Sequence, residues 1–128
     1  MPYTRKALLS VMGALEAATG VVLMAVPALL VELLLGVPPG TTAGLIASRI
    51  ASAALLALGV ACWLARHDAD CPAARGLVAG MLIYNVVVAA ILFLAWTHFG
   101  LSGVALWPAV LAHVGLAGWC IHSQWKGI

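Results

Sequence analysis

Charged residues are scarce in this chain of 128 residues. Six Lys or Arg and four Asp or Glu together make up 8% of it. A soluble globular domain has about 25% charged residues. Ten charges cannot cover a surface in water, which excludes a soluble enzyme, a nucleic-acid-binding domain and a disordered segment. The net charge of +2 is also too small to indicate an anionic partner.

Several motifs that carry chemistry are missing. The sequence has no phosphate-binding glycine loop, no H-E-x-x-H, no serine nucleophile elbow and no paired-cysteine redox motif. The three cysteines, Cys62, Cys71 and Cys120, are an odd number and do not make a complete disulfide framework. We interpret them as free thiols and expect no metal site. These absences weigh against an enzyme without excluding one.

Apolar residues, in contrast, make up 65% of the chain, and the mean hydropathy is +1.14. They gather in four stretches, at about residues 7–35, 43–65, 76–97 and 103–122. About 20 apolar residues in a helix cross the hydrocarbon core of a bilayer, and a backbone in lipid must bond within its own segment. We therefore predict an all-α, polytopic membrane protein, with residues 1–128 forming a single membrane domain in a lipid bilayer.

The first stretch is longer than a span requires, and Pro27 is expected to kink it or to mark where it leaves the membrane core. It is also too long for the apolar core of a signal peptide, and no convincing cleavage site follows it. We read it as a retained membrane helix.

The connections between the stretches are short, so neighbouring helices should run antiparallel in an up-down-up-down bundle of four transmembrane helices. Five of the six cations fall on one side of this bundle: Arg5, Lys6, Arg66, Arg75 and Lys126. The positive-inside rule then places both termini in the cytoplasm of a multi-pass protein of a bacterial inner membrane. Five tryptophans near the helix ends fit an interfacial belt: Trp63, Trp96, Trp107, Trp119 and Trp125.

Two ionisable residues are expected at the opposite end of the bundle. Glu32 lies near the end of the first stretch, and Arg49 near the start of the second. The turn at Pro38-Pro39-Gly40 should bring those ends together. We predict a structural ion pair between Glu32 and Arg49, because an unpaired charge in lipid is costly. A gate or a site for an anionic head group is the functional alternative.

Three polar residues are expected near mid-depth: Glu16, Asn85 and His113, with Tyr84 beside Asn85. Together they would form a polar cluster inside the bundle. One interpretation is purely structural: Glu16 forms a hydrogen bond to His113 or Asn85 and thereby fixes the helices relative to one another. The others are a ligand pocket, a proton-linked site, and an intramembrane enzyme with Glu16 and His113 as acid and base.

His113 is also a candidate axial ligand for a tetrapyrrole. The spacing Ala109-x-x-x-His113 places a small residue one turn before the histidine and resembles light-harvesting polypeptides. That resemblance implies an axial ligand for haem or another tetrapyrrole. A b-type haem usually has two ligands, and no second histidine lies in the middle of a stretch, since His98 and His122 are near the ends.

The layout of the chain is similar to that of small four-helix bacterial membrane proteins of the DoxX-like type. The similarity rests on Gly13-Ala-Leu-Glu-Ala-Ala-Thr-Gly20 and Pro27 in the first stretch, Ser48-Arg49-Ile-Ala-Ser52 opening the second, and His113 in the last. Most members have no known activity, and some are linked to quinone-dependent oxidation of sulfur compounds. The position of Glu16 also resembles the proton- and drug-binding glutamate of small multidrug resistance transporters, although Arg49 and His113 have no counterpart there.

From these observations we expect an accessory subunit of a membrane complex or a binder of a lipophilic ligand such as a quinone or a lipid. The alternative is a proton-coupled small-molecule transporter that acts through Glu16. The partner would be a larger complex or a second copy of the chain. Gly76-x-x-x-Gly80 favours close helix packing, either within the bundle or between protomers.

Overall fold

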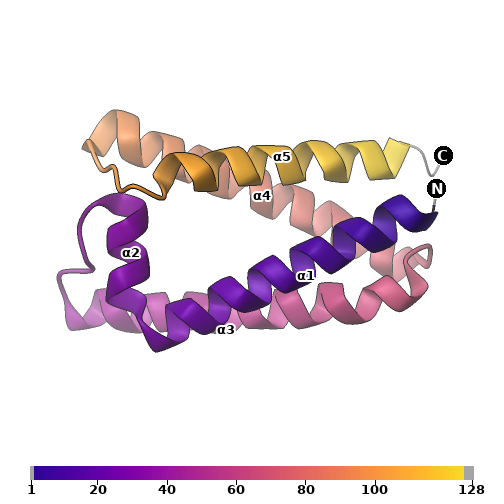
Figure 1. Ribbon diagram of the computed structural model, residues 1–128, viewed down its shortest axis with the longest axis horizontal. Coiled ribbons are helices and arrows are strands. Elements are labelled where there is room, and N and C mark those ends of the chain that lie inside the picture. The colour runs from indigo at the N-terminus through magenta and orange to yellow at the C-terminus, as the bar shows by residue number, and fades with distance from the viewer. Residues whose placement is uncertain (1, 126–128) are drawn as a thin grey trace.

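The computed structural model describes residues 2–125, and the regular structure of these residues is entirely helical (Figure 1). The elements are α1 (Pro2–Ala25), α2 (Pro27–Leu35), α3 (Thr42–Ala65), the 3-10 turn η1 (Arg66–Asp68), α4 (Pro72–Phe99) and α5 (Leu106–Trp125). The prediction of an all-α fold is confirmed. Lys126, one of the five clustered cations, lies outside the described residues.

The predicted helix over residues 7–35 is wrong as a single element, but the break comes at Pro27, where a kink was expected. It divides at Val26, whose φ of −134° and ψ of 62° are not helical, and α2 restarts with Pro27 at its first position. A proline disfavours helical backbone at the residue before it, and it has no N–H to donate to the preceding turn. At 1.5 Å per residue, the nine residues of α2 extend about 14 Å, which is too short to cross a bilayer.

The short α2 is held at its end by the connection between α4 and α5. The amides of Gly103 and Ala105 donate to the carbonyls of Leu34 and Leu33, at 3.0 and 2.8 Å. These carbonyls have no partner within α2, since the last turn of any helix leaves its C=O groups free. The same bonds keep residues 103–105 out of α5, which begins at Leu106 rather than at the expected residue 103.

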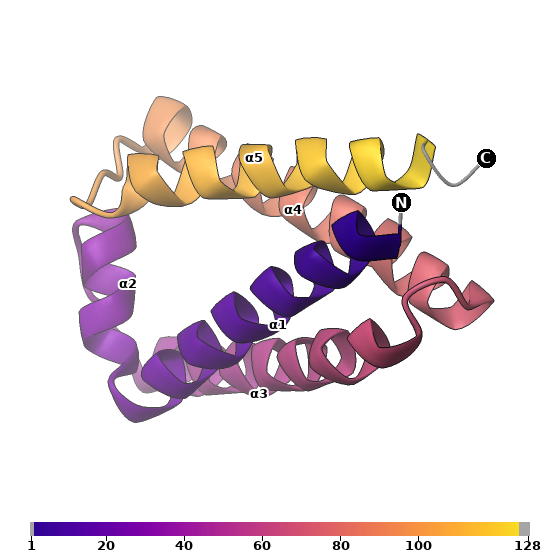
Figure 2. The same cartoon turned by 45° about the vertical axis from the view of Figure 1, so that its right-hand side comes forward.

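The four long helices form two pairs, because α1 packs mainly on α3 and α4 mainly on α5 (Figures 1 and 2). Successive long helices run in opposite directions, which is the alternation expected from the short connections. The start of α1, η1 and the end of α5 lie at one end of the molecule, and α2 lies across the other. We call the first the η1 end and the second the α2 end.

The α1–α3 contact depends on small residues. A Cβ added to Gly59 would lie only 2.6 Å from the backbone nitrogen of Ala17, and one added to Gly13 would lie 3.0 Å from the nitrogen of Trp63. The backbones therefore approach as closely as in small-residue helix contacts of membrane proteins. By contrast, a Cβ at Gly76 or Gly80 would meet nothing within 4 Å, so this pair does not serve packing within the described bundle.

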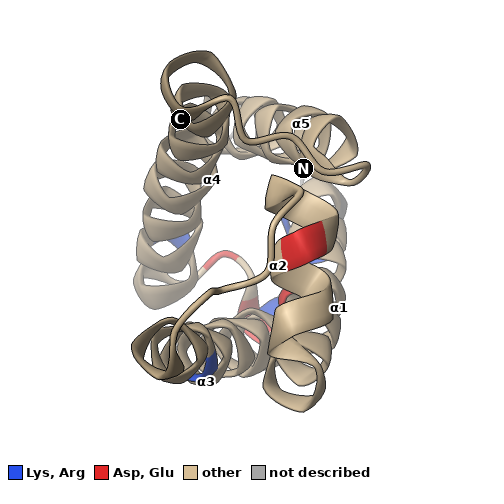
Figure 3. Cartoon of the chain, turned by 90° about the vertical axis from the view of Figure 1, so that its left-hand side faces the viewer, with Lys and Arg blue, Asp and Glu red and all other residues tan. Residues whose placement is uncertain are grey.

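Among the described residues, three helical segments are long and apolar enough to cross a membrane: Thr4–Ala25, Thr42–Asp68 and Pro72–Phe99. A membrane protein is expected to have such segments. The predicted fourth span, α5, is not among them. Charged residues occupy only short parts of the ribbon when the molecule is viewed from the α2 end (Figure 3).

Candidate functional site

Glu16 points from α1 toward α4 and binds Tyr84. The Tyr84 hydroxyl donates to Oε2 of Glu16 at 3.2 Å, and the glutamate as a whole is only 4% exposed. Neither Asn85 nor His113 bonds to Glu16 directly, so the predicted hydrogen-bond partners of Glu16 are wrong. Tyr84 takes this place because the small face of α1, with Gly13 and Ala17, packs on α3, and the adjacent face carries Glu16 toward α4.

Asn85 and His113 form the second part of the cluster. The fully buried Asn85 donates from Nδ2 to the carbonyl of Met81 at 2.7 Å, and its Oδ1 lies 2.8 Å from Nδ1 of His113. Since the amide nitrogen is already turned to a carbonyl, Oδ1 must be the acceptor of the second bond. Nδ1 of His113 therefore carries a proton, and in the neutral ring Nε2 keeps its lone pair.

Tyr84 links the two parts. Its ring meets that of His113 edge-on, with centroids 5.7 Å apart and an interplanar angle of 73°. The cluster Glu16, Tyr84, Asn85 and His113 is thus continuous and draws on α1, α4 and α5. The structure brings together all four residues that the sequence placed near mid-depth, and their role as a binding site stays a prediction.

The cluster has polar atoms left over for a ligand. Oε1 of Glu16 and Nε2 of His113 make no hydrogen bond to the described residues, yet neither atom is fully buried. Glu16 and His113 can therefore each reach one further hydrogen-bonding partner. An acidic group and an imidazole lone pair together suit a ligand that has both an acceptor and a donor.

The predicted Glu32–Arg49 ion pair is wrong. Both residues are exposed, and the ion pair found in residues 2–125 joins Arg5 to Asp70 instead. The prediction assumed one helix from residue 7 to residue 35 that ends beside the start of the next. The break at Val26 turns α2 away from the axis of α1, and Glu32 moves with it.

Arg5 is a residue whose contacts the sequence reasoning missed. It is 5% exposed, pairs with Asp70 and donates to the carbonyls of Ala69 and Ser123 at 3.2 and 3.1 Å. It thereby joins α1 to the α3–α4 connection and to the end of α5. Asp70 lies between Arg66 and Arg75, which the sequence places at the same end of the bundle as Arg5, and this proximity was the available signal.

The surroundings of His113 bear on the tetrapyrrole hypothesis. Ala109, which was expected to leave room for the macrocycle, packs against the apolar cluster of Leu92, Leu106 and Val110. The His113 ring also contacts the Tyr84 ring in an edge-on arrangement. The small residue therefore serves helix packing, and axial ligation of a tetrapyrrole by His113 stays a prediction.

Comparisons with protein-family models, with curated proteins and with solved structures find no match for this chain. They give no support to the resemblance to DoxX-like proteins, which rests on the layout of the sequence alone. The function must be argued from the residues themselves.

Proposed function

We propose that the chain is an integral membrane protein whose four long helices, α5 included, lie in the bilayer with both termini in the cytoplasm of a bacterial inner membrane. Large apolar side chains on the outer surface support a lipid environment, for example Ile50, Ile83 and Leu111, each about two-thirds exposed at 66–68%. An exposed apolar surface of this kind is unusual in water.

The distribution of cations and tryptophans supports the orientation. Arg66 and Arg75 lie at the η1 end together with Arg5, whereas the connections at the α2 end contain no Lys or Arg. Trp63 near the η1 end and the edge-to-face pair Trp96–Trp107 at the α2 end, with centroids 5.1 Å apart, suit the two interfaces of a bilayer. The α5 helix of 20 residues is about 30 Å long, which matches the hydrocarbon core.

We further propose that this protein binds a lipophilic ligand with a polar head group, of the quinone class, at the cluster Glu16, Tyr84, Asn85 and His113. The observation that carries this proposal is the pair of free polar atoms, Oε1 of Glu16 and Nε2 of His113, in two hydrogen-bonded pairs that meet through the Tyr84–His113 ring contact. A protonated Glu16 donates to a quinone carbonyl. The lone pair on His113 accepts from the hydroxyl of the reduced quinol.

A titration with a short-chain ubiquinone analogue tests this function. The full chain is purified in detergent, and binding is followed by quenching of tryptophan fluorescence. Glu16→Leu removes the hydrogen-bonding group and should weaken binding about tenfold, the value of one well-formed hydrogen bond to a ligand. Glu32→Leu is the matched control, since Glu32 is an exposed glutamate on α2, and it should leave binding unchanged.

Unchanged binding in Glu16→Leu, or no binding by the wild-type chain, would refute the quinone site. Circular dichroism establishes that each variant keeps its helices. An accessory-subunit role, the other half of our expectation from the sequence, has no specific observation in its favour.

Proton-coupled transport through Glu16 is a second candidate, favoured by the burial of this carboxyl group in a helix that can span the membrane. Glu16→Gln separates the two functions. The amide keeps an acceptor for Tyr84 and a donor for a ligand carbonyl, so quinone binding should be retained within about threefold. Transport would be abolished because an amide cannot carry a proton.

A further inference from the structure

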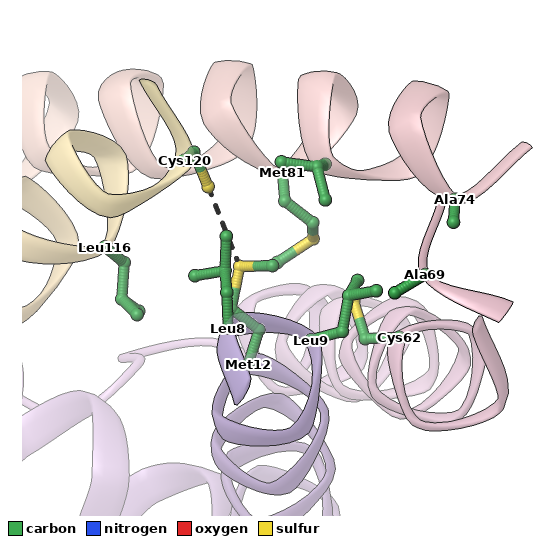
Figure 4. Close-up of a cluster of buried hydrophobic side chains, with 10 residues drawn as sticks. Leu8, Leu9, Met12, Cys62, Ala69, Ala74, Met81, Leu116 and Cys120 are labelled. Atoms are coloured by element: carbon green, nitrogen blue, oxygen red, sulfur yellow. Dashed lines mark hydrogen bonds between the residues drawn. The ribbon is translucent and has the colours of Figure 1, made fainter. Parts of the chain in front are cut away.

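Three sulfur-containing side chains meet in the buried apolar cluster near the η1 end, each from a different helix. Met12 of α1, Met81 of α4 and Cys120 of α5 are all 0% exposed and belong to this cluster. The Cys120 thiol points at Sδ of Met12, 3.9 Å away. Figure 4 shows Met81 reaching toward the same point from α4.

We propose that Cys120, Met12 and Met81 form a binding site for a soft monovalent metal ion, with Cu(I) as the physiological candidate. Thiolate and thioether groups are soft ligands, which select Cu(I) over the harder divalent cations. Its three ligands are different residues from Glu16, Tyr84, Asn85 and His113, although Tyr84 packs against the same apolar cluster and Asn85 donates to the Met81 carbonyl. The proposal does not depend on the quinone-binding function.

Charge balance favours a monovalent ion. A buried ion is costly in an apolar environment unless its charge is neutralised. One thiolate from Cys120 and two neutral thioethers give the ligand set a charge of −1, so Cu(I) makes the complex neutral. A divalent ion would leave one uncompensated positive charge among Leu8, Leu116 and the other apolar side chains of the cluster.

The sulfur separation also suits three-coordinate binding. Metal–sulfur bonds of about 2.3 Å, the length seen for zinc thiolates, at angles of 120° place two sulfur ligands about 4 Å apart. The observed 3.9 Å between Cys120 Sγ and Met12 Sδ is close to this value. The flexible Met81 side chain can supply the third ligand with only a rotamer change.

Other cations have no comparable set of ligands. Within residues 2–125, no three side chains among His, Cys, Asp and Glu lie close enough together to hold a metal ion. Cys62 belongs to the same apolar cluster, and Figure 4 shows its side chain beside Leu9. The two methionines therefore distinguish this site.

Binding exchanges one ion for one proton. The Cys120 thiol loses its proton to the solvent as the metal–sulfur bond forms, and no electron is transferred. One proton should therefore be released for each ion bound, as for other thiolate sites.

The test is a competition for Cu(I) between the purified full chain and the coloured chelator bicinchoninate, with ascorbate keeping the metal reduced. A Cys71→Ser background removes the less buried thiol, and serine preserves the N-cap of α4 that Cys71 provides. We expect one Cu(I) per chain. Met12→Leu and Met81→Leu should each weaken binding at least about tenfold, and Cys120→Ser should abolish it.

Met→Leu changes conserve volume and keep the core packed, so these variants fold even where Cys120→Ser does not. Met24→Leu, on α1 outside the cluster, and Cys62→Ser are the matched controls and should bind like the parent. X-ray absorption of the loaded protein should show sulfur neighbours alone at about 2.3 Å. No competition by the parent chain, or equal affinity in the methionine variants and the controls, would overturn the proposal.

Discussion

Arg5 offers the sharpest test of how the η1 end is held together. Its guanidinium group donates to two backbone carbonyls, of Ala69 and Ser123, and pairs with Asp70. Replacing it with Met keeps the long apolar stem but removes every donor. Replacing Asp70 with Asn removes only the charge of the partner. The two changes should differ strongly in cost.

The magnitudes follow from burial. A hydrogen bond from a charged group contributes about 1.5–3 kcal/mol, so two bonds to the carbonyls give about 3–6 kcal/mol. Nε of Arg5 is buried and has no partner in the described part of the chain. This unpaired donor costs about 1–3 kcal/mol, which reduces the net contribution of Arg5 to stability. Arg5→Met should therefore destabilise by about 2–4 kcal/mol. The Asp70 side chain is 62% exposed, so Asp70→Asn should cost less than about 1 kcal/mol.

The assay is reversible unfolding in mixed detergent micelles, with increasing SDS and helicity followed by circular dichroism. Arg5→Lys is an informative third variant. It keeps the charge, but a single ammonium group cannot replace the planar fork that reaches both carbonyls, so an intermediate loss is expected. Equal losses for Arg5→Met and Asp70→Asn would mean that the ion pair, rather than the carbonyl bonds, holds this end.

Four further predictions use the same unfolding assay or simple reporters. Gly59→Val should destabilise by about 1–3 kcal/mol, because the new side chain would overlap Ala17. Gly76→Ala, where a Cβ meets nothing, should be neutral or stabilising by up to about 1 kcal/mol, and a loss there would place an undescribed contact on this face. Asn85→Leu should cost about 1–3 kcal/mol by leaving Nδ1–H of His113 without an acceptor, and a silent change would show that this bond is not formed. Reporter fusions should place both termini in the cytoplasm, and a periplasmic terminus would contradict the proposed orientation.

The hydropathy of the sequence was sufficient to predict the long helices of the fold. Apolar runs of 20 or more residues can satisfy their backbone only as helices in lipid, so the positions of α3, α4 and most of α1 could be predicted from composition and length. The same depth argument selected Glu16, Tyr84, Asn85 and His113, since a rise of 1.5 Å per residue fixes the height of each side chain along a helix.

Height along a helix does not determine the direction in which a side chain points. Glu16 bonds to Tyr84 and not to His113 or Asn85, because the rotation of α1 is set by its glycine contacts with α3. The Glu32–Arg49 prediction was wrong for a related reason. A single break at Val26 changed the direction of nine residues, and no local pattern specified the new direction.

The sequence by itself determined where the long apolar helices lie, how apolar they are and at what height along each helix its polar residues stand, since each of these follows from residues that are neighbours in the chain. Only the tertiary structure decided the pairing of α1 with α3, the burial of Arg5 against Ala69 and Ser123, and the meeting of Met12, Met81 and Cys120. These contacts join residues far apart in the sequence. They depend on the rotation and tilt of whole helices, which the packing of all the side chains sets together.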